Sequence, residues 1–151
     1  MVRVPKVAWV MIVPVVVMAL ATVSVAQDTP TTVAGATTVT AEQVQALIAK
    51  GAKVFDLRKK ASYVEKHLPG AVHLAYDERS VKAANYDPRA DAFDVSRLGT
   101  DKKAPLIFHG HGVDGWKGYK AATAAVQAGY RNVYFFRGGF SEWIAKELPT
   151  E

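Results

Sequence analysis

Residues 105–122 read PLIFHGHGVDGWKGYKAA and limit the possible folds more than any other part of the chain. Leu106, Ile107 and Phe108 form a continuous apolar run, which is typical of a strand covered on both faces in a parallel sheet. A glycine-rich loop follows, and a helical pattern begins at Trp116. A buried strand joined by a short loop to a helix is half of a βαβ unit, so this segment predicts an α/β fold.

The rest of the chain continues the alternation of strands and helices. A capping box at Thr40 and Gln43 starts a helix that ends at Gly51. Residues 76–103 are polar and predict an irregular segment with one helical turn near 93–98. Further strands are expected at 54–57, 72–74 and 133–136, and further helices at 59–66, 116–127 and 141–148. The sequence therefore predicts one three-layer α/β domain over residues 38–150, with a mostly parallel central sheet flanked by helices.

The first 26 residues have the layout of a secretory signal peptide. Arg3 and Lys6 precede an uncharged run from residue 7 to 26, which ends in the small residues Ser24-Val25-Ala26. The alternative is a retained membrane anchor, because twenty uncharged residues can span a bilayer. Residues 27–37 are rich in Thr and Ala and predict a flexible leader. We expect a periplasmic or secreted domain, in contact with a membrane only if the N-terminal segment is retained.

Charge and cysteine content exclude several classes of function. The chain carries a formal charge of +5, and without Arg3 and Lys6 it has 17 basic against 14 acidic residues. These basic residues are scattered, so we expect no nucleic-acid partner. The chain has no cysteine. It therefore forms no disulfide and has no thiol chemistry.

Several segments, taken in order, resemble the rhodanese (sulfurtransferase) family along nearly the full length of the domain. They are Val54–Arg58 (VFDLR), His67–Ala71 (HLPGA), the strand, loop and helix of 105–122, Gly129–Tyr134 (GYRNVY), and Arg137–Phe140 (RGGF) with Trp143. The resemblance implies the three-layer rhodanese fold. The stretch from Trp116 onward is most similar to a branch whose loop carries two cysteines, five residues apart, and then a tryptophan.

The resemblance also shows what this chain lacks. The persulfide-forming cysteine of the family falls on Gly110, and the second cysteine of that branch falls on Gly115. His109 and Gly118 replace the usual tyrosine and serine. Sulfur transfer requires a thiolate that attacks the donor, and glycine has no side chain. We therefore predict no catalytic residue. The related phosphatases and arsenate reductases are excluded for the same reason.

The loop keeps features that suit a small anion. Gly110, Gly112 and Gly115 allow backbone conformations that turn several N–H groups inward, and a helix starts at Trp116. Ligands of open parallel sheets bind beyond the carboxyl ends of the strands, where this loop lies. We therefore predict an accessory or anion-binding domain, with a sulfur oxyanion, phosphate or carboxylate as ligand. The predicted loop site comprises Gly110, His111, Gly112, Val113, Asp114, Gly115 and Trp116.

Four further residues are candidates for the pocket around this loop. Arg137 follows the last strand and is the strongest basic candidate; His109, Arg58 and Lys117 complete the set. The partner is expected to be a small anion or another protein. The alternative to anion binding is that the glycines merely close a loop that has lost its cysteine.

A metal-dependent or histidine-dependent protein is a second alternative. If the chain is extended at residues 109–111, His109 and His111 face one side, and Asp114 adds a third ligand for zinc, copper or iron. The string Gly110 to Gly115 also satisfies G-x-G-x-x-G, but no acidic residue follows the next strand to hold a ribose. We therefore expect no cofactor.

Overall fold

The computed structural model describes Arg3 and residues 27–151. The predicted signal peptide, residues 1–26, lies outside the described residues except for Arg3, which is exposed. Among the helices of the described residues, none combines the length and the apolar character needed to span a bilayer.

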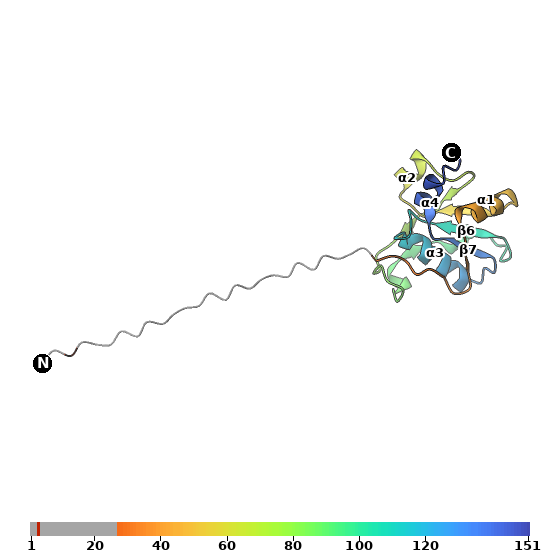
Figure 1. Ribbon diagram of the computed structural model, residues 1–151. Coiled ribbons are helices and arrows are strands. Elements are labelled where there is room, and N and C mark those ends of the chain that lie inside the picture. The colour runs from red at the N-terminus through yellow and green to blue at the C-terminus, as the bar shows by residue number, and fades with distance from the viewer. Residues whose placement is uncertain (1–2, 4–26) are drawn as a thin grey trace.

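A five-stranded parallel sheet forms the centre of the domain (Figure 1). The strand order is β1-β7-β6-β2-β3, and every neighbouring pair is parallel. The strands are β1 (Thr37–Thr38), β2 (Lys53–Asp56), β3 (Val72–His73), β6 (Leu106–His109) and β7 (Val133–Phe136). The order confirms the α/β prediction, and all four residues of the central strand β6 are buried.

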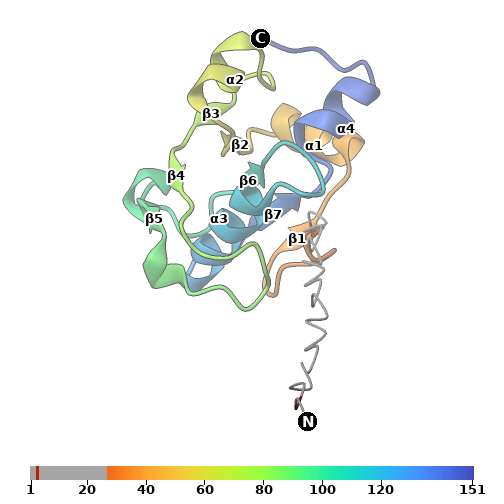
Figure 2. The same ribbon diagram turned by 90° about the vertical axis from the view of Figure 1, so that its left-hand side faces the viewer.

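Helices cover both faces of this sheet. Helix α3 (Trp116–Gln127) packs on one face, against β6 and β7. The other face carries α1 (Ala41–Ala49) and α4 (Gly139–Ala145), with α2 (Lys60–Glu65) near its edge (Figure 2). The predicted capping box is present at the start of α1, where the Thr40 hydroxyl accepts from the Gln43 N–H and the Gln43 side chain accepts from the Thr40 N–H.

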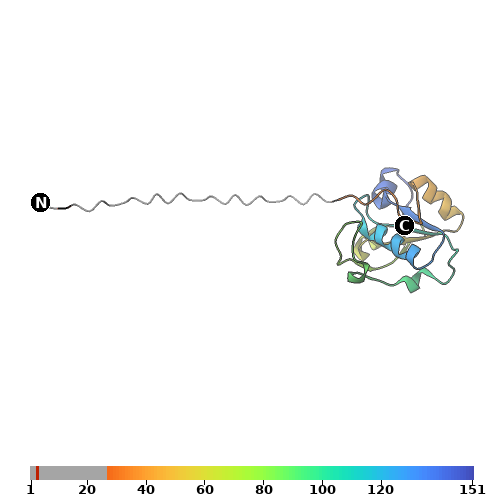
Figure 3. The same cartoon turned by 90° about the horizontal axis from the view of Figure 1, so that it is seen from below.

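Two hydrophobic clusters, one on each face of the sheet, form the core. The first packs Phe55 and Phe108 of the sheet against the alanines of α3, which let the helix lie close to the strands. The second joins Trp143 of α4 to Phe136 of β7, with a ring separation of 6.4 Å. Figure 3 shows the domain from below, with α3 across it. The three-layer arrangement follows from this pair of apolar faces.

The long segment between β3 and β6 contains more order than the sequence predicted. It forms a small antiparallel sheet of β4 (Tyr76–Asp77) and β5 (Ala92–Phe93). Two 3₁₀ helices flank β5, at Pro88–Ala90 and Val95–Leu98, and the second is the predicted helical turn. Strands of two residues leave almost no periodicity in a sequence, so the pattern did not reveal them.

The predicted flexible leader is packed against the domain instead. The side chains of Thr29 and Val33 are almost fully buried, with 2% and 3% of their surface exposed. Thr37 and Thr38 pair with β7 as an edge strand. Prediction from composition failed because hydrogen bonds and two buried side chains, rather than a long apolar run, hold this segment. We refer to residues 27–33 as the N-terminal strap.

Candidate functional site

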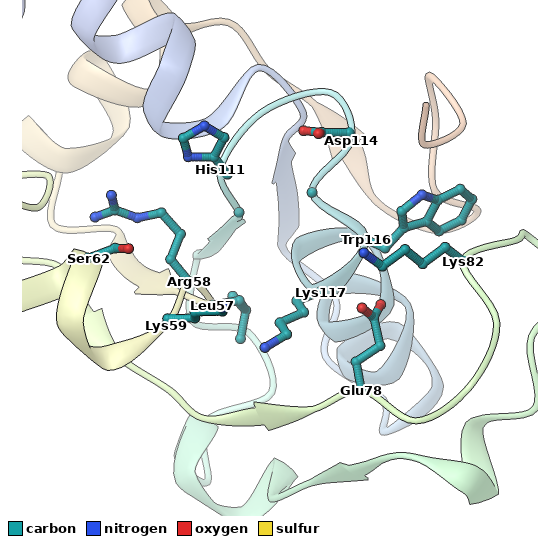
Figure 4. Close-up of a pocket in the computed structure, with 12 residues that line it drawn as sticks. Leu57, Arg58, Lys59, Ser62, Glu78, Lys82, His111, Asp114, Trp116 and Lys117 are labelled. Atoms are coloured by element: carbon teal, nitrogen blue, oxygen red, sulfur yellow. The ribbon is translucent and has the colours of Figure 1, made fainter. Parts of the chain in front are cut away.

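A cavity of about 300 Å³ opens at the carboxyl ends of β2 and β6 (Figure 4). The predicted loop forms one wall of it through Gly110, His111, Asp114, Gly115 and Trp116. The remaining lining residues come from α2 and the segment before it, from the β4 segment and from α3: Leu57, Arg58, Lys59, Ser62, Glu78, Lys82 and Lys117. The cavity lies where ligands bind in open parallel sheets.

The backbone carbonyls of residues 110–114 all accept hydrogen bonds from the protein. Helix α4 donates to two of them, since the Phe140 N–H binds the Gly110 carbonyl (3.1 Å) and the Ser141 N–H binds the His111 carbonyl (2.8 Å). Two bonds close the loop on itself, from residue 115 to 112 and from residue 116 to 114. The Val113 carbonyl accepts twice from Thr29 of the strap.

The N–H groups of the same loop are left free. Within the described part of the chain, the N–H groups of residues 111–114 donate to no other protein group. A planar trans peptide places the N–H of one residue opposite the carbonyl of the residue before it, and the described residues contain no cis peptide bond. Holding the carbonyls of 110–113 therefore also fixes the direction of these four N–H groups. Successive free N–H groups make an anion-binding concavity.

Glycines allow the close backbone approach at this loop. A Cβ atom at Gly110 would lie 3.2 Å from the Gly115 backbone, and a Cβ at Gly115 would lie 2.8 Å from the Gly112 carbonyl oxygen. Gly139 has φ of +57°, and its Cβ would lie 2.5 Å from the Gly110 carbonyl oxygen. A side chain at 115 would therefore clash with the loop, whereas one at 110 would need the Gly115 backbone to shift by a few tenths of an ångström.

His109 is fully buried beneath the loop and does not line the cavity. Its Nδ1 atom donates to the Gly110 carbonyl at 2.9 Å, while its Nε2 atom lies 3.8 Å from Asp56 Oδ2. Burial lowers the pKa of His109, against the attraction of the Asp56 carboxylate. The neutral ring with its proton on Nδ1 is thus a support for the loop.

Arg58 lines the cavity, but most of its guanidinium is committed to the protein. It pairs with Asp56 through Nε and Nη2, and the shortest contact is 2.7 Å. Nη2 also donates to the Lys66 carbonyl, and the group stacks 3.8 Å from the Phe140 ring. Burial opposes ionisation of Asp56, but the hydrogen bonds from Arg58 outweigh it and lower the carboxyl pKa. Arg58, a pocket candidate from the sequence, therefore anchors this wall of the cavity.

The opposite wall depends on a lysine that the sequence did not identify. Lys120 of α3 is fully buried and contacts Glu78 Oε2 at 2.9 Å, Ser80 Oγ at 2.8 Å and Asp91 Oδ2 at 3.7 Å. Burial opposes ionisation of Asp91 as well, yet hydrogen bonds from Ser80, Arg79 and Tyr76 hold its pKa at about 2. This cluster joins the irregular segment to α3 and places Glu78 and Lys82 at the cavity.

Three lysines supply the positive charge of the cavity: Lys59, Lys82 and Lys117. Arg58 is paired with Asp56, and Glu78 shares Lys120 with Asp91, so Asp114 is the carboxylate of the described lining residues that has no ion-pair partner. Only Lys117 was identified from the sequence, because it lies at the start of a helix. Lys59 follows the VFDLR segment directly and could have been found by extending that motif, whereas nothing local marks Lys82.

Arg137, Gly112 and Val113 do not line this cavity. Arg137 does not line the cavity; its Nε and Nη2 atoms donate to the Thr29 carbonyl at 3.1 and 2.8 Å. Gly112 and Val113 face an open hollow on the outer side of the loop, together with Asp28. The sequence placed Arg137 at the correct edge of the sheet, but the strap was not predicted, and its Thr29 carbonyl accepts from two of the guanidinium nitrogens.

The predicted metal alternative does not form. Among the residues that the structure describes, no three His, Cys, Asp or Glu side chains gather closely enough to hold a metal ion. His109 is buried and points its Nδ1 at a carbonyl, while His111 is exposed on the loop. The extended geometry assumed for residues 109–111 is wrong because the chain leaves β6 at Gly110.

Comparisons with known proteins show the family to which the chain belongs. The rhodanese-like domain family matches residues 40–146. The chain is 36% identical over 102 residues to the thiosulfate sulfurtransferase GlpE of Pseudomonas entomophila, which covers 68% of this chain and 79% of that protein. It is 30% identical over 114 residues to GlpE of Haemophilus influenzae, covering 75% and 92%.

Solved structures show the same fold. The thiosulfate sulfurtransferase of Pseudomonas aeruginosa superposes with a TM-score of 0.52 and 27% identity, covering 77% of this chain and 19% of that one. The BH2092 protein of Bacillus halodurans gives a TM-score of 0.57 at 21% identity, covering 77% of each chain. The chain belongs to the rhodanese-like domain family. It contains no cysteine and therefore has no thiolate to act as the nucleophile of a sulfurtransferase reaction.

Proposed function

We propose that this domain binds a small anion, in the first place a sulfur oxyanion such as thiosulfate or sulfate, and acts as an accessory module without transferring sulfur. The observation that supports this most strongly is the asymmetry of the loop backbone. Its carbonyls at 110–114 are all held by protein donors, while its N–H groups at 111–114 donate to none in the described chain. A bound anion would accept from such N–H groups, and those of His111 and Asp114 belong to residues that line the cavity.

Charge supports the same proposal. The start of α3, a helix of 12 residues, lies at the cavity and contributes the positive end of its dipole. Lys59, Lys82 and Lys117 add three cations. They outnumber the unpaired carboxylate of Asp114 and the one negative charge left where Glu78 and Asp91 share Lys120. This excess favours an anion over a neutral or cationic ligand.

Calorimetric titration of the purified protein with sodium thiosulfate and with sodium sulfate, at constant ionic strength, tests the proposal. We expect binding that weakens in Lys117→Gln and stays unchanged in Lys103→Gln. Lys103 is exposed and does not line the cavity, so it is a matched control. Ligand at ten times Kd should stabilise the fold by about 1.4 kcal/mol. No heat and no thermal shift at millimolar ligand would contradict the proposal.

The absence of sulfur transfer is tested separately. With thiosulfate and cyanide as substrates, we expect thiocyanate to form no faster than in buffer, because no thiolate is present to hold the transferred sulfur. Turnover above the buffer rate, retained after further purification, would show that the domain uses another nucleophile.

Export belongs to the same proposal. The two cations, the uncharged run and the Ser-Val-Ala sequence before residue 27 support a signal peptide. The mass of the protein recovered outside the cytoplasm separates cleavage after Ala26 from a retained anchor.

A further inference from the structure

The N-terminal strap, residues 27–33, lies before the residues that match the rhodanese-like family, which begin at position 40. It nevertheless contacts the loop that forms the candidate site. The Trp116 Nε1 atom donates to the Gln27 carbonyl at 2.7 Å, although the two residues are 89 positions apart. The strap thus lies outside the part of the chain that matches the family, and it contacts the loop of the candidate site.

Thr29 makes the central contact of the strap. Its N–H and its hydroxyl both donate to the Val113 carbonyl, at 2.8 and 2.7 Å, across 84 positions of sequence. Its own carbonyl receives two hydrogen bonds from Arg137, so the strap is held from both sides. Thr29 is 2% exposed, and water is therefore poorly placed to replace these bonds.

We infer that Thr29 is a positioning residue for the anion site and acts through the peptide between Val113 and Asp114. This inference rests on the proposed function. Because a trans peptide is planar, a carbonyl of Val113 held by Thr29 fixes the N–H of Asp114 in the opposite direction. The Asp114 N–H is one of the four free donors of the loop. Without Thr29 the peptide could rotate and present an oxygen where the anion needs a donor.

Three variants of the full chain test this role. Thr29→Val removes the hydroxyl donor at nearly constant size, and Thr29→Ser retains it. Thr38→Val is the matched control, because the Thr38 hydroxyl donates to the Thr31 carbonyl within the same N-terminal segment and does not touch the loop. Each variant is measured by thiosulfate titration, by amide hydrogen exchange without ligand, and by thermal melting.

We expect Thr29→Val to weaken thiosulfate binding about five-fold, the effect of one lost hydrogen bond. In the ligand-free protein, the amides of Gly115 and Trp116, which bond within the loop, should exchange about five-fold faster. Thr29→Ser and Thr38→Val should behave like the unmodified chain in both measurements. The exchange measurement needs no ligand, so it reports on the strap independently of anion binding.

The outcomes separate the two proposals. If the unmodified chain binds no anion but Thr29→Val still accelerates exchange in the loop, the proposed function is wrong. The claim that Thr29 stabilises the loop is then still supported. If Thr29→Val changes neither exchange nor affinity, the inference is overturned. A lower melting temperature with unchanged affinity also overturns it, because the strap would then stabilise the fold only.

Discussion

The two walls of the cavity are each anchored by a buried ion pair, but the two pairs are built differently. Asp56 is the last residue of β2, and Arg58 lies two positions later, just after the strand. Lys120 reaches Glu78 and Asp91 from another element, across 42 and 29 positions of sequence. One anchor is local, and the other exists only after the chain has folded.

This difference has an energetic consequence. If the Asp56 carboxylate is removed, Arg58 still donates to the Lys66 carbonyl and stacks on the Phe140 ring. The carboxylates around Lys120 have no second cation within reach in the described contacts, and Lys120 itself is fully buried. Breaking the long-range anchor should therefore cost more than breaking the local one.

The largest effect is expected for Lys120→Met. The substitution keeps the length of the side chain but leaves the Glu78 and Asp91 carboxylates without their cation. Removal of one partner from a buried pair costs about 3–5 kcal/mol of unfolding free energy. Urea denaturation measures it, and a loss below 1 kcal/mol would show that the anchor does not hold this wall.

Asp56→Asn should have the next largest effect. It leaves Arg58 buried without a countercharge but still bonded to the Lys66 carbonyl, so we expect a loss of about 2–3 kcal/mol. The measurement is the same urea titration. A loss equal to or greater than that of Lys120→Met would reverse the comparison between the two anchors.

The pH dependence of stability reports on His109, which lies against the local anchor. Its pKa in the folded state is lowered from 6.5, so below pH 6.5 the unfolded chain binds a proton that the folded chain does not. Stability contributed by the neutral ring is present above pH 6.5 and is lost as the pH falls toward the folded pKa, at up to about 1.4 kcal/mol per pH unit.

Urea titrations at pH 7.5, 6.5 and 5.5 measure this slope. His109→Asn retains an N–H donor for the Gly110 carbonyl but has no group that titrates, so its slope should be shallower. The carboxyl of Asp56 does not interfere, because its pKa lies below 3.8. Equal slopes in the two proteins would assign the pH dependence to other groups.

The smallest effect is expected for Tyr76→Phe. The Tyr76 hydroxyl donates to Asp91 Oδ2 at 2.9 Å. When this hydroxyl is removed, Asp91 still accepts hydrogen bonds from Ser80 and Arg79. We expect a loss of about 1 kcal/mol, typical of one hydrogen bond. A loss as large as that of Lys120→Met would make Tyr76, rather than Lys120, the main support of the long-range anchor.

Local patterns were enough to predict the layers of the fold, the capping box at Thr40, the helix Trp116–Gln127, the strand Val133–Phe136 and the glycine-rich loop. They also established that no thiolate exists, because the absence of cysteine is a property of composition. These features depend on periodicity, caps and residue type, which act over a few neighbouring positions.

The tertiary structure alone decided which groups face the cavity. It turned Arg137 to the strap, buried His109 beneath the loop and brought Lys82 and Glu78 to the opposite wall. It also packed residues 27–33, which composition had suggested were flexible, against the loop. Hydrogen bonds between residues 84 to 108 positions apart leave no periodic trace in the sequence, so only the folded chain reveals them.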